Sequence, residues 1–176
     1  MPDWTRMNTL MKPRNGKRFC LVNDHQENTM VLIDTVNHYV VMSDSVREKD
    51  FNSEIIDKAY GDVLCLGFGI GFILQPLIQK DEVKSITVIE KYQDVLDDCA
   101  SQFTFPDKVR IIHADAVTWQ PDMKFDVIWD DCDWLVDQGE IVIGSPYEAS
   151  VRLKEYLNPD GLYLKWRDDG RYRESG

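Results

Sequence analysis

The sequence predicts an α/β fold, in which a doubly wound parallel sheet with helices on both faces follows a small β-hairpin. From residue 61 to residue 166, apolar runs of strand length alternate with segments of helical periodicity. This alternation is typical of a parallel sheet with crossover helices. Before residue 61 the chain has short runs rich in β-branched and aromatic residues, separated by short polar connections. That pattern favours antiparallel strands.

Residues 1–60 are predicted to form an N-terminal tail, the hairpin and a connecting helix. The strand-like runs are 18–22, 29–34 and 38–42. The sequence DTVN (34–37) joins the last two, and its aspartate and asparagine supply turn chemistry. Residues 50–60 have a helical pattern with Ile55 and Ile56 on one side.

Residues 61–166 are predicted to be the main domain, and residues 167–176 a polar tail. The predicted strands are 62–67, 85–90, 109–115, 125–131 and 161–166. The predicted helices are 70–80, 91–103 and 145–157. Pro76 is expected either to kink the first of these helices or to lie near its boundary.

The helix over 145–157 has a clear predicted start. Ser145 can cap it, Pro146 suits the first turn, and Glu148 completes an S-x-x-E capping box. The sequence NPDG (158–161) is expected to end this helix before the last strand begins.

The composition excludes several classes of protein. A length of 176 residues suits one domain, and a formal net charge of −11 argues against nucleic acid as a partner and favours a small or cationic one. No apolar run reaches about 18 residues, so no membrane span is expected. No two cysteines form a CxxC pair, which predicts reduced thiols, no zinc site and a cytoplasmic location. The cysteines are Cys20, Cys65, Cys99 and Cys132.

Three glycines at alternate positions end the first strand of the main domain, Gly67, Gly69 and Gly71. Glycine accepts positive φ and lets a ligand approach the backbone closely, so these residues are predicted to floor a nucleoside pocket. The spacing departs from the G-x-G-x-x-G dinucleotide fingerprint, because Phe72 stands where its third glycine would be. No Lys-Ser/Thr pair follows, so a phosphate loop is excluded.

Acidic residues end the next two strands. Glu90 lies 23 residues after Gly67 and can accept hydrogen bonds from both hydroxyls of a ribose. Asp115 can accept a hydrogen bond from an adenine amino group, and Ala116 leaves room for the ring. Three successive strand ends thus offer a backbone cradle, a ribose acceptor and a base acceptor.

This ordered set resembles the class I S-adenosylmethionine-dependent methyltransferases, from about Asp62 to Trp166. The resemblance implies a Rossmann-like sheet with strand order 3-2-1-4-5 and S-adenosylmethionine as the cofactor. It also implies a set of residues that contact the cofactor. They are Gly67, Phe68, Gly69, Gly71, Glu90, Lys91, Asp115, Ala116 and Asp131.

The hairpin, the connecting helix and the strand FDVIWDDCD (125–133) are similar to the spermidine synthases. Their fourth strand ends in a catalytic aspartate, which aligns with Asp131. Guanidinoacetate-type methyltransferases have an aspartate at the same place and a G-F-G loop like 67–69.

The sequence departs from both families at two positions that usually carry an acid for the amino end of the cofactor. Cys65 stands two positions before the first glycine, and Ile70 stands between the second and third. The sixth and seventh strands of the family are expected to be absent, because only ten polar residues follow Trp166.

The stretch WDDCDWLVDQGE (129–140) reads as an acidic loop at the end of the fourth strand. Asp131 is predicted to lie beside the pocket, where a carboxylate can deprotonate or orient an amine. Asp133, Asp137 and Glu140 are interpreted as solvated loop charges, and Asp130 is expected to point to the face opposite Asp131. Trp129 and Trp134 are interpreted either as a cation-binding pair or as core or interface residues. No calcium loop is predicted, because Val136 stands where its glycine is needed.

The sequence therefore favours a methyltransferase that uses S-adenosylmethionine and acts on a small, amine-bearing or cationic acceptor, with Asp131 as the catalytic residue. One alternative is an aminopropyltransferase of the spermidine synthase kind, which uses decarboxylated S-adenosylmethionine. Another is a non-catalytic module that binds an adenosine ligand or serves assembly. Open strand edges at 161–166 and in the hairpin predict a homodimer or larger homo-oligomer.

Overall fold

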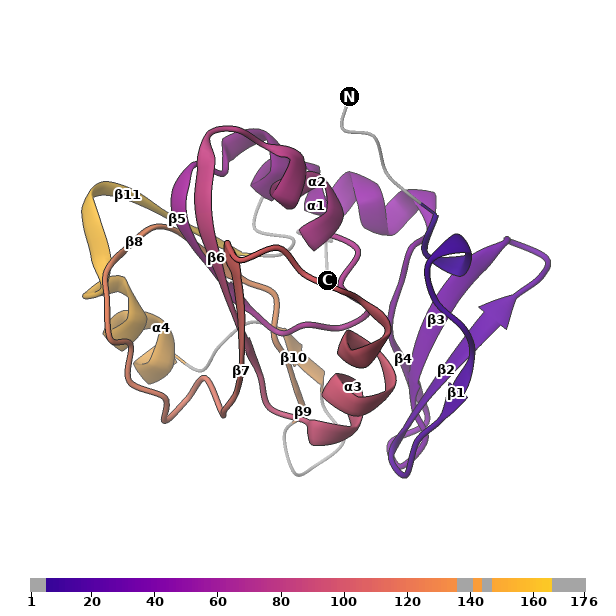
Figure 1. Ribbon diagram of the computed structural model, residues 1–176. Helices are drawn as coiled ribbons and strands as arrows, with labels where there is room; N and C mark the ends of the chain where they lie inside the picture. Colours follow the sequence, from indigo (N-terminus) through magenta and orange to yellow (C-terminus); the bar gives the residue numbers. More distant parts are fainter. Residues whose placement is uncertain (1–5, 136–140, 144–146, 166–176) are drawn as a thin grey trace, which may run out of the picture.

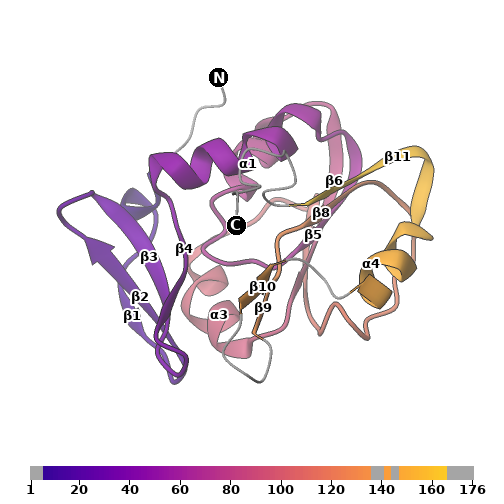
Figure 2. The same cartoon turned by 180° about the vertical axis from the view of Figure 1, so that it is seen from behind.

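The computed structural model describes residues 6–135, 141–143 and 147–165. It has two β-sheet modules side by side, an N-terminal antiparallel sheet and a larger parallel sheet with helices (Figure 1). Helix α1 (Val46–Lys58) spans from one module to the other, as Figure 2 shows from behind. Among the described residues, no helix combines the length and the apolar character that crossing a membrane requires.

The parallel sheet has five strands in the order β11-β8-β5-β6-β7. Numbered along the chain from the first glycine-loop strand, this order is 5-4-1-2-3, so the predicted order 3-2-1-4-5 is confirmed. Its strands are β5 (Gly61–Leu66), β6 (Val83–Glu90), β7 (Val109–His113), β8 (Phe125–Asp130) and β11 (Leu157–Lys165). Every pairing is parallel, so the carboxyl ends of all the strands meet at one edge.

Two apolar clusters fill the two faces of this sheet. One holds Val63, Cys65 and Trp129 together with residues of α1, of α2 (Leu74–Gln79) and of α3 (Gln93–Asp98). The other holds Leu64, Ile128 and Leu153 of helix α4 (Tyr147–Lys154). Side chains alternate between the faces because successive strand residues point in opposite directions. The predicted arrangement, with helices on both faces, is confirmed.

The N-terminal module is larger than the predicted hairpin, because it is a four-stranded sheet in the order β1-β2-β3-β4. Its strands are β1 (Arg14–Asn15), β2 (Phe19–Asp24), β3 (Thr29–Asp34) and β4 (Tyr39–Ser43), preceded by a 3-10 turn, η1 (Met7–Thr9). The hairpin across DTVN is confirmed, and the Asp34 carboxylate accepts the amides of Val36 and Asn37 in that turn. The short strand β1 was not predicted.

The buried carboxylate of Asp44 connects two segments of the N-terminal module by hydrogen bonds. Asp44 is 2% exposed and accepts the backbone amides of Met7, at 2.8 Å, and Met30, at 2.7 Å. A buried amide without a partner costs free energy, so these bonds fix the turn at Met7 against β3.

Helix α1 (Val46–Lys58) begins four residues before the predicted start at residue 50. The Ser45 hydroxyl accepts the amide of Glu48, which is N-cap chemistry that the sequence analysis missed. The buried face includes Ile55 and Ile56, as the helical pattern predicts.

The helices after β5 and β6 are shorter than predicted. Helix α2 occupies only Leu74–Gln79 of the predicted 70–80, because Gly71 has a positive φ that no α-helix accommodates. Pro76 is the third residue of α2, where a missing amide breaks no helical bond. The predicted helix over 91–103 divides into α3 and a separate 3-10 turn, η2 (Ala100–Gln102).

The end of the chain also departs from the predicted elements. Helix α4 (Tyr147–Lys154) ends before residue 157, and NPDG lies within β11 as an irregularity between Leu157 and Leu162. Asp160 has a φ of 65° there. The NPDG segment therefore forms a bend within β11, whereas it was predicted to lie before the strand. The predicted cap residues Ser145 and Pro146 lie outside the described residues, and so does the tail 167–176.

The acidic stretch is not only a loop, because β9 (Asp133–Leu135) and β10 (Ile141–Ile143) pair in an antiparallel hairpin. Asp137 and Glu140 lie outside the described residues. Trp129 is fully buried in the core, so its interpretation as a core residue is confirmed. All four cysteines are thiols and none forms a disulfide, as predicted.

Candidate functional site

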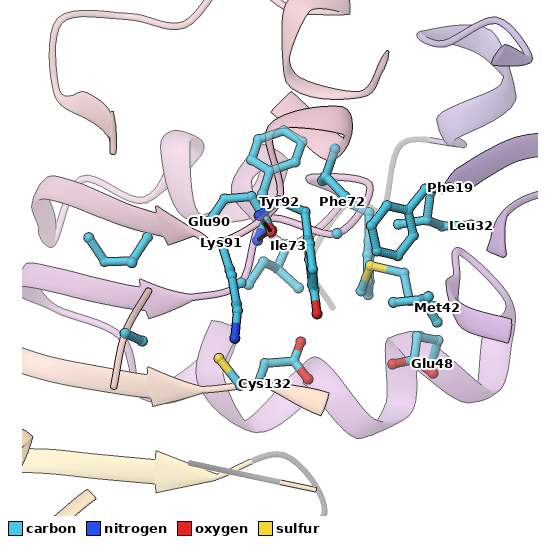
Figure 3. Close-up of a pocket in the computed structure, with 18 of the residues that line it drawn as sticks. Phe19, Leu32, Met42, Glu48, Phe72, Ile73, Glu90, Lys91, Tyr92 and Cys132 are labelled. Carbon is cyan, nitrogen blue, oxygen red and sulfur yellow. Dashed lines mark hydrogen bonds between the residues drawn. The ribbon is translucent and has the colours of Figure 1, made fainter. Parts of the chain in front are cut away.

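One cavity lies where the carboxyl ends of β5, β6, β7 and β8 face the N-terminal sheet, and Figure 3 shows the side chains around it. Seven of the nine predicted cofactor-contacting residues line it. They are Gly67, Phe68, Gly69, Glu90, Lys91, Ala116 and Asp131. The other two, Gly71 and Asp115, belong to the same loops but are not among its lining residues.

The glycine loop after β5 needs its glycines for two reasons. Gly67, Gly69 and Gly71 have φ values of 92°, 55° and 71°, a region that side chains strain. Protein atoms also occupy the space where their side chains would be. A Cβ on Gly71 would lie 2.7 Å from the Phe68 ring, and a Cβ on Gly67 would lie 3.1 Å from the backbone oxygen of Asp131.

Glu90, the last residue of β6, holds this loop. Its carboxylate accepts the amide of Phe68 at 2.9 Å and the amide of Tyr92 at 2.8 Å, one on each oxygen. The residue is 6% exposed. Burial raises the pKa of the Glu90 carboxyl, and the hydrogen bonds from these backbone amides counter part of that rise.

Tyr92 forms a wall of the cavity and links it to the N-terminal module. Its ring lies 4.9 Å from the Phe19 ring, and the Arg18 guanidinium lies 4.5 Å above it. Two nitrogens of that guanidinium donate to Asp34, at 3.0 and 2.8 Å. The stacking position of Tyr92 thus depends on an ion pair within the antiparallel sheet.

The end of β7 supplies Ala116, which is buried at the cavity wall. The neighbouring Asp115 carboxylate pairs with the Lys91 ammonium at 2.9 Å and accepts the amide of Val117. Partial burial opposes ionisation of Asp115, but Lys91 and this amide outweigh it and lower its pKa. An ion pair across two strand ends therefore joins Asp115, the predicted base acceptor, to Lys91, the residue that follows the predicted ribose acceptor Glu90.

The end of β8 separates two adjacent aspartates. Asp131 lines the cavity and is half-buried, whereas Asp130 is fully buried and accepts the Tyr163 hydroxyl at 2.7 Å. Cys65 lies in the core of the neighbouring strand. Burial, and secondarily the charge of Asp131, raise the pKa of the Cys65 thiol to about 12, so it stays protonated.

The N-terminal module contributes cavity residues that the sequence analysis missed, among them Tyr39, Met42 and Glu48. Figure 3 shows Met42 and Glu48 on one side of Tyr92, and Lys91 and Cys132 on the other. The S-x-x-E pattern at Ser45 would have predicted the true start of α1 and so placed Glu48 on this helix. No local signal points to Met42, because its contacts are with residues of the glycine loop.

No protein-family model matches this chain, and no curated protein matches it. Solved structures do match. The spermidine synthase from Thermotoga maritima is 16% identical with a TM-score of 0.61, and the match covers 88% of this chain and 55% of that one. The N-methyltransferase NodS from Bradyrhizobium japonicum WM9, in complex with S-adenosyl-L-homocysteine, is 16% identical with a TM-score of 0.53. That match covers 69% of this chain and 62% of NodS. The CcbJ methyltransferase from Streptomyces caelestis is 16% identical with a TM-score of 0.51, covering 66% and 48%.

At these identities the likeness establishes the fold, which is the Rossmann-like sheet of the class I S-adenosylmethionine-dependent methyltransferases and of spermidine synthase. The chain spans about half the length of the first relatives it matches. Residues 61–176 make up about two thirds of the chain, so a match over 88% of it extends into the N-terminal module. The other two matches cover 66% and 69% of this chain, and shares of that size can be reached without the N-terminal sheet.

We expect Glu90→Gln to change how stability depends on pH. Burial raises the pKa of Glu90 in the folded protein, so ionisation at higher pH costs stability that the unfolded chain does not lose. The free energy of unfolding of the wild type should fall, relative to that of Glu90→Gln, as the pH rises above about 4.3, the ordinary glutamate value. Denaturant unfolding between about pH 4 and about pH 7 measures this difference, with the exposed Glu82→Gln as control. A difference that does not vary with pH would contradict it.

Proposed function

We propose that this chain transfers a methyl group from S-adenosylmethionine to a small acceptor that carries an amine. One observation carries the proposal: four neighbouring strand ends present the residues of such a site to a single cavity, in spatial order. From β7 to β8 these are Ala116, Glu90, the loop residues from Gly67 to Gly69, and Asp131. In parallel α/β sheets, ligands bind at this edge.

The residues present fit an adenosine cofactor. Ala116 gives an adenine ring room beside Asp115. The two oxygens of Glu90 accept the amides of Phe68 and Tyr92, and because a carboxylate oxygen has two lone pairs, they can also accept hydrogen bonds from ribose hydroxyls. Lys91 and Tyr92 flank the same position on the β6–α3 connection. With the base and ribose held there, the glycine loop and Asp131 would be the residues next to the substituent on the 5′ sulfur.

The charge of the cavity suits cationic ligands. Glu48, Glu90 and Asp131 bring carboxyl groups to its lining from α1, β6 and β8. The lining lysine, Lys91, is already paired with Asp115. A sulfonium cofactor and an amine acceptor both carry positive charge near neutral pH, and carboxylates in a partly dry cavity attract them.

Catalysis in this proposal rests on orientation and on one base. When bound, the cofactor supplies an electrophilic carbon on its sulfonium. Transfer would form a bond from the acceptor nitrogen to that carbon and break the carbon–sulfur bond, so the cavity residues of this chain would have to hold the two reactants in line. Asp131 holds the acceptor amine and takes the proton that it must lose.

Aminopropyl transfer from decarboxylated S-adenosylmethionine is a second candidate. It is favoured by the match to the Thermotoga maritima spermidine synthase, which extends into the N-terminal module and has a TM-score of 0.61. The Cys65 and Ile70 departures bear on both candidates, because neither residue supplies an acid for the amino end of the cofactor.

Calorimetry with four ligands tests the proposal. We expect S-adenosylmethionine and S-adenosylhomocysteine to bind the chain, because the cavity offers base, ribose and sulfonium partners together. Tighter binding of decarboxylated S-adenosylmethionine than of S-adenosylmethionine would favour aminopropyl transfer. If none of the four ligands binds, including methylthioadenosine, the result would favour a non-catalytic assembly module over an enzyme.

Asp131→Asn should lower turnover by about 10²–10⁴-fold, because the amide keeps the shape and cannot accept the proton of the amine. Binding of S-adenosylmethionine should change by less than about tenfold, or roughly 1.4 kcal/mol. Turnover of a panel of small amines and calorimetry measure the two effects. Asp130→Asn is the control, since Asp130 is buried against Tyr163 and away from the cavity lining. Loss of turnover in the control alone would place the base at Asp130.

We also propose a homodimer. β11 and β7 are the outer strands of the parallel sheet as described, and β4 is an outer strand of the N-terminal sheet. Val36 and Val40, at and beside β4, are 63% and 57% exposed, and open apolar edges invite pairing. Light scattering at micromolar concentration should give twice the chain mass of 20.5 kDa. A mass of one chain would contradict the dimer.

A further inference from the structure

Met42 of β4 covers the middle of the glycine loop. Its sulfur accepts the backbone amide of Ile70 at 3.1 Å. A Cβ built on Gly69 would lie 1.9 Å from the same sulfur, so the thioether fills the space that this glycine leaves open. Met42 also lines the cavity, near Glu48 in the view of Figure 3.

The strand order decides which part of a ligand would reach Met42. An adenine at the end of β7 and a ribose at Glu90 place the 5′ substituent over the end of β5, the next strand in the sheet. That end is followed by Gly69 and Ile70, the residues that Met42 covers. The base and the ribose can therefore bind without moving Met42, whereas a long 5′ substituent meets its side chain.

We propose that Met42 is a specificity-determining residue, which a long 5′ substituent must displace and a short one need not. The inference rests on the proposed adenosine site. It adds the residue that makes binding depend on the length of the 5′ substituent. A thioether is a weak acceptor, so the Ile70 amide loses little when the sulfur leaves and a ligand carboxylate replaces it. Methionine is unbranched and has three rotatable bonds, so it can withdraw without a shift of β4.

Two substitutions at this position should act in opposite directions. Met42→Ala removes the side chain that must be displaced, so S-adenosylhomocysteine should bind about 2- to 10-fold more tightly. Met42→Gln keeps an unbranched chain and offers the Ile70 amide a stronger oxygen acceptor. It should therefore weaken S-adenosylhomocysteine binding by a similar factor. Methylthioadenosine, whose 5′ substituent ends at one methyl group, should change by less than about twofold in both variants.

Calorimetry on the full chain measures both ligands, and their ratio within each variant corrects for any loss of folded protein. Met123→Ala is the matched control, because Met123 is 36% exposed and does not line the cavity. A ratio that is unchanged in both variants, or that moves in the same direction in both, overturns the role of Met42. A wild type that binds neither ligand would instead overturn the proposed adenosine site, so the two failures are distinguishable.

Discussion

Two backbone amides from different loops meet on the buried carboxylate of Glu90, and the geometry of the site depends on this meeting. The amide of Phe68 fixes the glycine loop after β5, and the amide of Tyr92 fixes the connection after β6. The first bond holds Phe68, whose ring covers Gly71. The second bond positions Tyr92, whose ring forms a wall of the cavity. Without the carboxylate, the buried amide of Phe68 and the partly buried amide of Tyr92 would need other partners, because leaving a buried amide unpaired costs about 1–3 kcal/mol. One side chain therefore serves the fold and the candidate ligand site together.

The cavity belongs to both modules, and the parallel sheet alone would not enclose it. Arg18 stacks on Tyr92 and is held by Asp34 of β3, while its own backbone amide donates to Asp94 of α3. Met42 adds a contact from β4 to the glycine loop. These contacts close the side of the cavity that faces away from the strand ends. The N-terminal sheet thus acts as a wall of the site, which agrees with a structural match that extends into it.

The sequence predicted the elements whose signals are local. Buried parallel strands read as apolar runs, so β5 to β8 and the acids that end them were recognised, and the order of the sheet followed from the family resemblance. Signals that depend on distant packing were missed. Met42 lines the cavity only because β4 folds back on the glycine loop, and the Lys91–Asp115 pair joins residues from two strands. The predicted bounds were wrong where the backbone takes a conformation that local patterns do not indicate. Helix α2 begins at Leu74 and not at residue 70, and NPDG forms a bend within β11.

The neutral thiol of Cys65 has a consequence for protein engineering. The family pattern would place an acid at this position, in the core and within reach of the Asp131 charge. Two carboxyl groups in such a place repel each other, and the pair resists full ionisation. An acid introduced at position 65 by a single change would therefore set a second charge against the one at Asp131. A redesign that places an acid at position 65 therefore has to change Asp131 as well.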